Sequence, residues 1–167
     1  MRIEVAQRHE IGTMLVLIEE LLAELGDEEQ EFAGIDREKL RADIELNMGA
    51  GGGGSAEPGS ASGSGRFLAL LATEESGTAI GLLTLSASFA LYAGGEYGVI
   101  DEMYVRPEYR CRGVGRALVD EAVAIARQKR WFRLDVTGPE HERGARAVRF
   151  YENMGFEFTG PKLRRLV

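Results

Sequence analysis

At 167 residues, with 44% apolar and 28% charged residues, the chain has the size and composition of one globular domain with a buried core. A formal net charge of −7 argues against nucleic-acid binding, which requires a basic face. No apolar run could span a membrane, the N-terminal MRIEVAQRHE lacks the apolar stretch of a secretory signal, and the single cysteine, Cys111, can form no intramolecular disulfide, so the expected compartment is the cytoplasm.

The residues before position 49 predict one strand and two helices. Residues 2–5 alternate like a short strand, and apolar residues at helical spacing from Ile11 to Leu25 predict a helix that ends at Gly26. Asp36 is a favourable N-cap residue for a second helix. The narrow apolar face of this second helix consists of Leu40, Ile44 and Met48.

Residues 49–65 read GAGGGGSAEPGSASGSG, a low-complexity segment without side chains that could build a core. The residues before it are too few to form a stable core alone, so the segment is interpreted as a flexible insertion in a single domain, 1–167, and not as an interdomain linker. A functional loop is the alternative, but a tolerated surface insertion is favoured because loop-closure entropy grows slowly with length.

The second half predicts further strands alternating with two helices. The first three predicted strands are 67–73, 80–91 and 97–105. One helix follows, with Leu118, Val119, Ala122, Ile125 and Ala126 on one face. The remaining predicted elements are a strand at 132–137, a helix at 145–154, and candidate strands at 156–159 and 163–167. This order predicts an α/β fold, with a mixed sheet of six to seven strands flanked by about four helices on both faces.

Residues 104–118, YVRPEYRCRGVGRAL, lead from a predicted strand into a helix and have the features of an anion-binding loop. Gly113 and Gly115 allow the backbone to approach a ligand closely, and the first turn of the helix leaves amide N–H groups unpaired. Three arginines add guanidinium groups suited to phosphate oxygens: Arg110, Arg112 and Arg116. These residues predict a phosphate-bearing ligand.

The spacing excludes two common phosphate motifs. No G-x-x-x-x-G-K-[ST] run exists, and Leu118 stands where G-x-G-x-x-G needs its last glycine. What remains is R-x-x-G-x-G from Arg110 to Gly115, followed by A-x-x-F-Y-x-x-x-G-F from Ala147 to Phe156. Together these motifs resemble the two signatures of the GNAT N-acetyltransferase superfamily. The resemblance covers residues 66 to 167 well and the first half in outline.

The resemblance implies a GNAT-like fold, with acetyl-CoA as cosubstrate. Its pyrophosphate would lie in the loop from Arg110 to Arg116, with Gly113, Val114 and Gly115 at the centre. The preceding strand would pair with the pantetheine arm, which places Met103 and Val105 beside the cofactor. The alternative interpretation is an ordinary glycine turn beside solvated arginines.

Three residues are candidates for the chemistry of acetyl transfer. Tyr151 stands where the family often has a tyrosine near the thioester sulfur, so it is a candidate general acid or thiolate stabiliser; the alternative is a core aromatic. Asp101 and Glu102 lie on the strand that often supplies the base in this family. Successive strand residues face opposite sides, so only one can face the acceptor, and Asp101 shares its parity with Met103 and Val105. A surface or hydrogen-bonding role for either carboxylate is the alternative.

The chain departs from the family pattern in two places. Cys111 stands where glycine is common; a thiol at an electropositive helix N-terminus could be reactive, but a tolerated small side chain is the favoured interpretation. Gly144 replaces a frequent asparagine, which puts one cofactor or substrate contact in doubt. Glu140 and His141 could border the acceptor cleft, although a solvated histidine is favoured. One cysteine and two separated histidines, His9 and His141, fit no metal site.

The predicted function is an acetyl-CoA-dependent N-acetyltransferase, in which a primary amine attacks the thioester directly in a ternary complex. The acceptor is expected across the sheet from the cofactor, against the first helices and residues 80–105. A small amine is favoured, and a protein N-terminus or lysine remains open. The alternatives are an acetyl-CoA-binding sensor without turnover and a nucleotide-phosphate protein. A homodimer is compatible with the resemblance.

Overall fold

The computed structural model describes residues 1–25, 36–48, 65–137 and 141–160. Five strands form one sheet in the order β1-β2-β3-β4-β5. Their bounds are Arg2–Val5 (β1), Phe67–Thr73 (β2), Ala79–Ala90 (β3), Gly95–Val105 (β4) and Leu134–Val136 (β5). The first four strands are antiparallel neighbours, and β5 runs parallel to β4. The helices are Ile11–Leu25 (α1), Arg37–Asn47 (α3), Val114–Gln128 (α4) and His141–Asn153 (α5).

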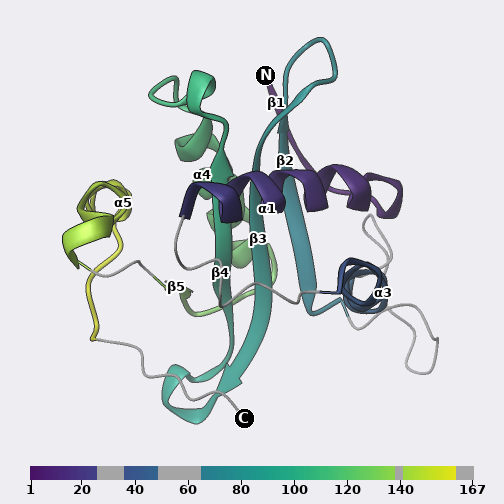
Figure 1. The fold of residues 1–167 in the computed structure, drawn as a ribbon. Helices are drawn as coiled ribbons and strands as arrows, with labels where there is room; N and C mark the ends of the chain where they lie inside the picture. Colours follow the sequence, from purple (N-terminus) through teal and green to yellow (C-terminus); the bar gives the residue numbers. More distant parts are fainter. Residues whose placement is uncertain (26–35, 49–64, 138–140, 161–167) are drawn as a thin grey trace.

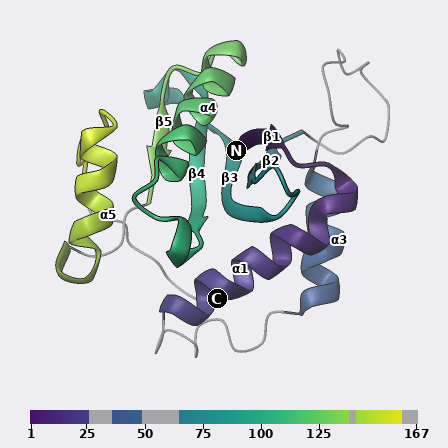
Figure 2. The same cartoon turned by 90° about the horizontal axis from the view of Figure 1, so that it is seen from above.

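The helices cover both faces of the sheet. Helices α1 and α3 lie on one face, and α4 and α5 lie on the other (Figures 1 and 2). Each face has its own hydrophobic core: Leu70 of β2 packs in the core that includes α4, whereas Leu71 packs in the core that includes α1. Because both faces of the central strands are buried, β2 and β3 read as nearly continuous apolar runs.

Two details of the helices confirm the sequence patterns. The five residues predicted for the apolar face of the helix after the loop are all buried on α4. The carboxylate of Asp36 accepts hydrogen bonds from the backbone N–H groups of Glu38 and Lys39, both at 3.0 Å, so it caps α3 as expected. None of the described helices combines the length and the apolarity that a bilayer-spanning helix needs.

The sheet is smaller in the described residues than the sequence predicts, although the α/β fold class is confirmed. The strand expected at 156–159 is wrong, because the chain there forms no strand. Gly155 takes a left-handed φ of 87°, and the backbone N–H of Phe156 bonds to the carbonyl of Tyr151, which ends α5 with a turn. The candidate strand at 163–167 lies outside the described residues, as does the insertion apart from Gly65.

Candidate active site

Strands β4 and β5 pair over the three residues of β5, and β4 continues beyond this paired segment to Val105. The ladder joins Gly98–Ile100 to Leu134–Val136. In the described part of the chain, no strand pairs with this side of β4 from Glu102 to Val105. Backbone donors and acceptors along such an edge can pair with an extended ligand that lies beside the strand. The sheet therefore offers a place for an extended amide-containing chain next to Met103 and Val105.

A β-bulge interrupts β4 directly after the segment that pairs with β5. Leu85 of β3 faces Ile100 and Leu83 faces Met103, so Asp101 and Glu102 together lie opposite Thr84. Consequently Ile100 and Met103 both pack in the core on the α4 side, although strict alternation would place them on opposite faces. The parity argument that groups Asp101 with Met103 therefore does not hold across this segment.

The bulge brings Glu102 and Thr84 together. The Thr84 hydroxyl donates to Oε2 of Glu102 and accepts from the backbone N–H of Glu102 at 3.0 Å. Thr84 is only 2% exposed. Burial raises the pKa of Glu102, an effect that the Thr84 hydroxyl opposes and the negative charge of Asp101 reinforces. Asp101 itself is exposed. Glu102 therefore lies in an environment that shifts its pKa towards that of a useful base.

Tyr151 lies in the core on the opposite face of the sheet. It is 8% exposed, and its ring packs edge-to-face against Phe150 and Phe156, with centroids 5.2 and 5.4 Å away. Its hydroxyl is 3.9 Å from Sδ of Met103 on the open part of β4. Burial raises the pKa of Tyr151 to about 12, so the phenol is a protonated donor at neutral pH. The core contacts and the direction of the hydroxyl suit both interpretations of this residue.

The loop that contains the R-x-x-G-x-G motif, Arg110 to Gly115, connects β4 to α4 as the sequence predicts. Gly113 precedes the helix with a left-handed φ of 84°, a conformation that side chains other than glycine rarely adopt. A Cβ on Gly115 would lie 3.4 Å from the ring of Phe150, which leaves little room between α4 and α5. Val114 is buried, whereas Arg112 and Arg116 are exposed. The start of α4 therefore presents backbone N–H groups and two exposed arginines to the solvent.

Arg110 makes different contacts from the other loop arginines. Its Nε donates to the carbonyl of Val105 at 2.7 Å. Its Nη1 and Nη2 donate to the two carboxylate oxygens of Glu24 on α1, at 2.7 and 2.5 Å. The guanidinium is thus turned towards α1.

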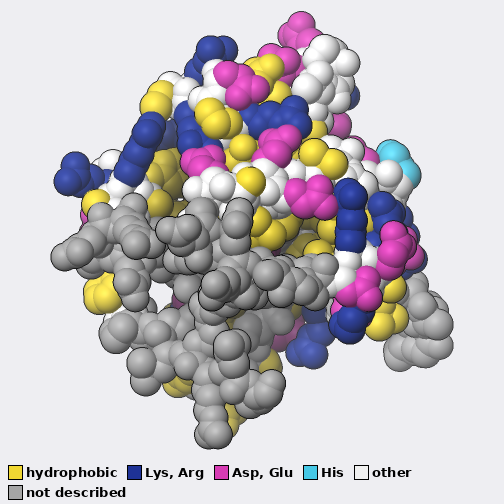
Figure 3. Space-filling view, viewed as in Figure 1, with side chains coloured by type: hydrophobic (Ala, Val, Ile, Leu, Met, Phe, Trp, Pro, Cys, Tyr) yellow, Lys and Arg dark blue, Asp and Glu magenta, His cyan; other side chains and the backbone are white. Residues whose placement is uncertain are grey.

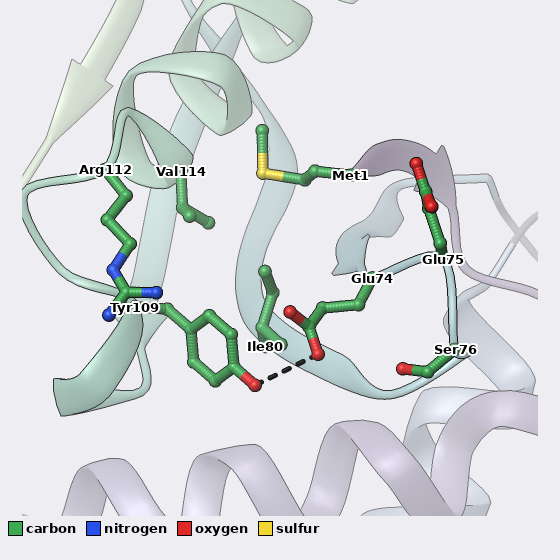
Figure 4. Close-up of a pocket in the computed structure, with 8 residues that line it drawn as sticks. All are labelled: Met1, Glu74, Glu75, Ser76, Ile80, Tyr109, Arg112 and Val114. Atoms are coloured by element: carbon green, nitrogen blue, oxygen red, sulfur yellow. Dashed lines mark hydrogen bonds between the residues drawn. The ribbon is translucent and has the colours of Figure 1, made fainter.

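A cavity of about 470 Å³ lies between the loop and the turn that joins β2 to β3. Arg112 and Tyr109 stand on one side of it, with Glu74 and Glu75 on the other, and the Tyr109 hydroxyl donates to Glu74 at 3.0 Å (Figure 4). The two carboxylates outnumber the single arginine among the lining residues and so disfavour an anion there. The cavity is therefore poorly suited to the pyrophosphate, although it adjoins the loop.

A second cavity, of about 560 Å³, lies between α3 and the outer part of β3. Asp43 and Asn47 of α3 line it, as do Ser86 and Ser88 of β3. Alternate residues of a strand share a face, so these two serines continue the row that begins at Thr84. This polar row runs along the sheet face that carries α1 and α3, away from Glu102.

The remaining sequence candidates are distributed as follows. Cys111 is exposed, and its backbone has a left-handed conformation with a φ of 60°. Its sulfur lies 3.0 Å from Nη2 of Arg146. Gly144 is buried on α5. Glu140 lies outside the described residues, and the placement of the His141 side chain is likewise not described. Within the described ranges, no group of three or more His, Cys, Asp or Glu side chains could hold a metal ion.

Sequence reasoning missed two residues of the site. Thr84 is the buried polar side chain in the middle of β3, and a threonine inside an otherwise apolar run was an available signal. Glu24 carries no such signal, because it is one of several acidic residues on a helix and its partner lies 86 positions away.

Comparison with known proteins agrees with this architecture. The sequence model of the acetyltransferase (GNAT) family matches residues 52–156, and the chain belongs to that family. The family implies acetyl-CoA as a cosubstrate.

The relatives that match differ in their acceptors. The peptidyl-lysine N-acetyltransferase YjaB of Salmonella typhimurium is 33% identical over 61 residues, and the match covers 36% of this chain and 37% of that protein. The chain thus spans little more than a third of this curated relative. An aminoglycoside acetyltransferase from an uncultured soil sample has a similar structure, with a TM-score of 0.73 at 18% identity over 99% of this chain and 95% of that one. A ribosomal-protein-alanine N-acetyltransferase from Brucella melitensis has a TM-score of 0.66 at 17% identity over 99% and 100%. At such identities the two structures show the fold alone.

Proposed function

We propose that this enzyme moves the acetyl group of acetyl-CoA to the primary amine of a small molecule, by direct attack in a ternary complex. The observation that carries the proposal is the pairing of Glu102 with Thr84 at the bulge of β4, beside the part of that strand that has no partner strand on one side among the described residues. Met103, the next residue, contacts the Tyr151 hydroxyl from the other face. A candidate base and a candidate acid thus flank one short segment.

The edge of β4 from Glu102 to Val105 and the loop after it suit the two parts of the cofactor. The pantetheine arm contains amides that can pair with the backbone of Glu102 to Val105. Its pyrophosphate can accept hydrogen bonds from the N–H groups at the start of α4, where the helix dipole favours an anion. Arg112 and Arg116 are exposed beside this helix start and can add charge.

Glu102 is proposed as the general base. An amine reaches the enzyme largely as an ammonium ion, which cannot attack a carbonyl carbon. Glu102 takes one proton from it, directly or through a water molecule, and the free amine then forms a bond to the thioester carbon. Burial keeps the pKa of Glu102 above its ordinary value, which makes the carboxylate a stronger base than an exposed one.

Tyr151 is proposed as the general acid. When the tetrahedral intermediate collapses, the carbon–sulfur bond breaks and the sulfur leaves with the electron pair. The Tyr151 hydroxyl, which remains protonated because burial raises its pKa to about 12, can supply a proton to that sulfur. The phenolate regains a proton from the nitrogen of the new amide, so the products are the amide and the free thiol of CoA.

The acceptor is proposed to lie on the face with α1 and α3, because Glu102 and Thr84 face that side. The cavity with Asp43, Ser86 and Ser88 offers two hydroxyls further along the same face, and a carboxylate that also pairs with Lys39 at 2.6 Å. These groups suit a compact amine with additional hydroxyl or amino groups. The names of the relatives mention peptidyl-lysine, aminoglycosides and a ribosomal-protein alanine, so peptide acceptors belong in any test.

Thiol release from acetyl-CoA, measured over a panel of polyamines, aminoglycosides and lysine-containing peptides, tests the proposal. We expect steady release with a small amine and a rate about 10²-fold lower for Tyr151→Phe with the same amine. Release only with peptides would contradict the small-molecule assignment. Binding of acetyl-CoA without release for any acceptor would favour the sensor alternative.

A further inference from the structure

Two ion pairs join α1 to the segment that follows β4. Glu20 accepts from Nε and Nη2 of Arg106, at 3.0 and 2.7 Å, and Glu24 accepts from both terminal nitrogens of Arg110. The two glutamates are four positions apart, as are the two arginines. Tyr104 lies close to both ion pairs, and the Arg110 guanidinium is 5.6 Å from its ring centroid. On the face that carries α1, basic and acidic side chains are interspersed (Figure 3).

Arg110 has its three nitrogens engaged within the protein. Nε is bonded to Val105, the last residue of β4, and the other two are bonded to Glu24 in the bidentate geometry that makes arginine–carboxylate pairs strong. Arg110 holds the pKa of the Glu24 carboxyl below its usual range, so the pair is ionised at neutral pH. To reach a phosphate, the guanidinium would have to give up Glu24.

We propose that Arg110 is a positioning residue that ties the start of the phosphate loop to α1 and to the end of β4, and that it is not a phosphate ligand. The inference rests on the proposed function, because it concerns the same cofactor loop. Two residues separate Arg110 from Gly113, so fixing Arg110 restricts where the N–H groups at the start of α4 can point. The loop is thereby held in a binding geometry before the cofactor arrives.

The substitution Glu24→Gln separates this role from direct phosphate binding by the sign of its effect. Glu24 lies on α1 and is not part of the loop. If Arg110 positions the loop, loss of the ion pair loosens the loop, and we expect CoA to bind about fivefold more weakly, which corresponds to about 1 kcal/mol. If Arg110 is a phosphate ligand, its release from Glu24 makes it more available, and CoA should bind equally well or more tightly.

A double-mutant cycle with Arg110→Gln tests the same point independently. In the positioning account both single variants weaken CoA binding, and the double variant is no weaker than the weaker single one. Glu19→Gln is the matched control, because Glu19 is on the same helix, is likewise exposed, and pairs with Arg37 of α3 at 3.1 Å. This control should bind CoA as the unaltered protein does.

Calorimetric titration of each full-length variant with CoA gives the dissociation constants without any need for turnover. Thermal melting shows that each variant is folded. Unchanged or tighter binding by Glu24→Gln, or additive losses in the cycle, would overturn the inference and leave the proposed function intact. If the unaltered protein does not bind CoA at all, the proposed function and the inference fail together.

Discussion

At the scale of single residues, the most informative contact is that between Thr84 and Glu102. The hydroxyl both donates to the carboxylate and accepts from the N–H of the same residue. It therefore holds the bulge in place and lowers the pKa of the Glu102 carboxyl group, whereas burial raises that pKa. Removal of the Thr84 hydroxyl should change the geometry of the bulge little, but it should change the proton affinity of Glu102 measurably.

Thr84→Val keeps the shape of the side chain and removes the hydroxyl. Without that hydrogen bond the pKa of Glu102 should rise further, since the bond favours the ionised form. Glu102 must be ionised to act as a base, so the acidic limb of the pH profile of kcat/KM should move to higher pH. The profile of acetyl transfer measures this shift, and an unmoved limb would argue against Glu102 as the titrating base.

Cys111 permits a test of backbone strain in the loop. Its φ of 60° is left-handed, a conformation that costs a residue with a Cβ about 1–2 kcal/mol. Cys111→Gly should relieve this cost, partly offset by the greater entropy of glycine in the unfolded chain. Compared with Cys111→Ala, which keeps the strain and also loses the sulfur, the glycine variant should be more stable by about 1 kcal/mol in denaturant unfolding. Equal stabilities would contradict the account.

At the scale of elements, the position of β5 determines which part of β4 has a strand partner on that side. A Cβ on Gly98 would lie 2.4 Å from both Leu134 of β5 and Trp131. The absence of a side chain at this position allows the short β5 to approach β4 closely.

Gly98→Ala should therefore push β5 and Trp131 outward and lower the free energy of unfolding by about 2 kcal/mol. Gly12→Ala provides a control on α1, where an added Cβ would be 3.6 Å from Arg41 and alanine favours the helix. The control should be neutral or stabilising. Equal unfolding midpoints in urea for Gly98→Ala and the unaltered protein would contradict this packing argument.

The sequence predicted those parts of the fold that depend on local patterns. The face of α4, the cap at Asp36 and the loop before α4 all follow from periodicity or from a residue with a clear local preference. No local pattern in the sequence indicates the bulge at Asp101 and Glu102, because the bulge depends on which residues of β3 lie opposite these two. The contact of Thr84 spans 18 positions and that of Glu24 spans 86, so pairing of these residues could not be read from spacing.

At the scale of the whole molecule, the sheet separates two cores, and the proposed reactants occupy opposite faces of it. Tyr151 belongs to the core with α4, and Glu102 faces the side of α1 and α3. The cofactor would contact β4, the loop and α4, which follow one another in the sequence. A ligand that binds only the folded protein stabilises it.

Acetyl-CoA at 100 times its dissociation constant should stabilise the folded protein by about 2.7 kcal/mol and raise its Tm accordingly. ATP at the same concentration should raise the Tm much less, because it has no pantetheine arm to pair with the open edge of β4. Thermal melting with each ligand measures the difference. An equal shift with ATP would favour the nucleotide-phosphate alternative.

Glu102, and not Asp101, is proposed as the base. Steady-state acetyl transfer by Glu102→Gln and Asp101→Asn, with the acceptor found in the amine panel, tests it most directly. We expect kcat to fall by about 10²-fold or more for Glu102→Gln, with little change in the KM for acetyl-CoA, and to change by only a few-fold for Asp101→Asn. A larger loss for Asp101→Asn, or an active Glu102→Gln enzyme, would contradict the account.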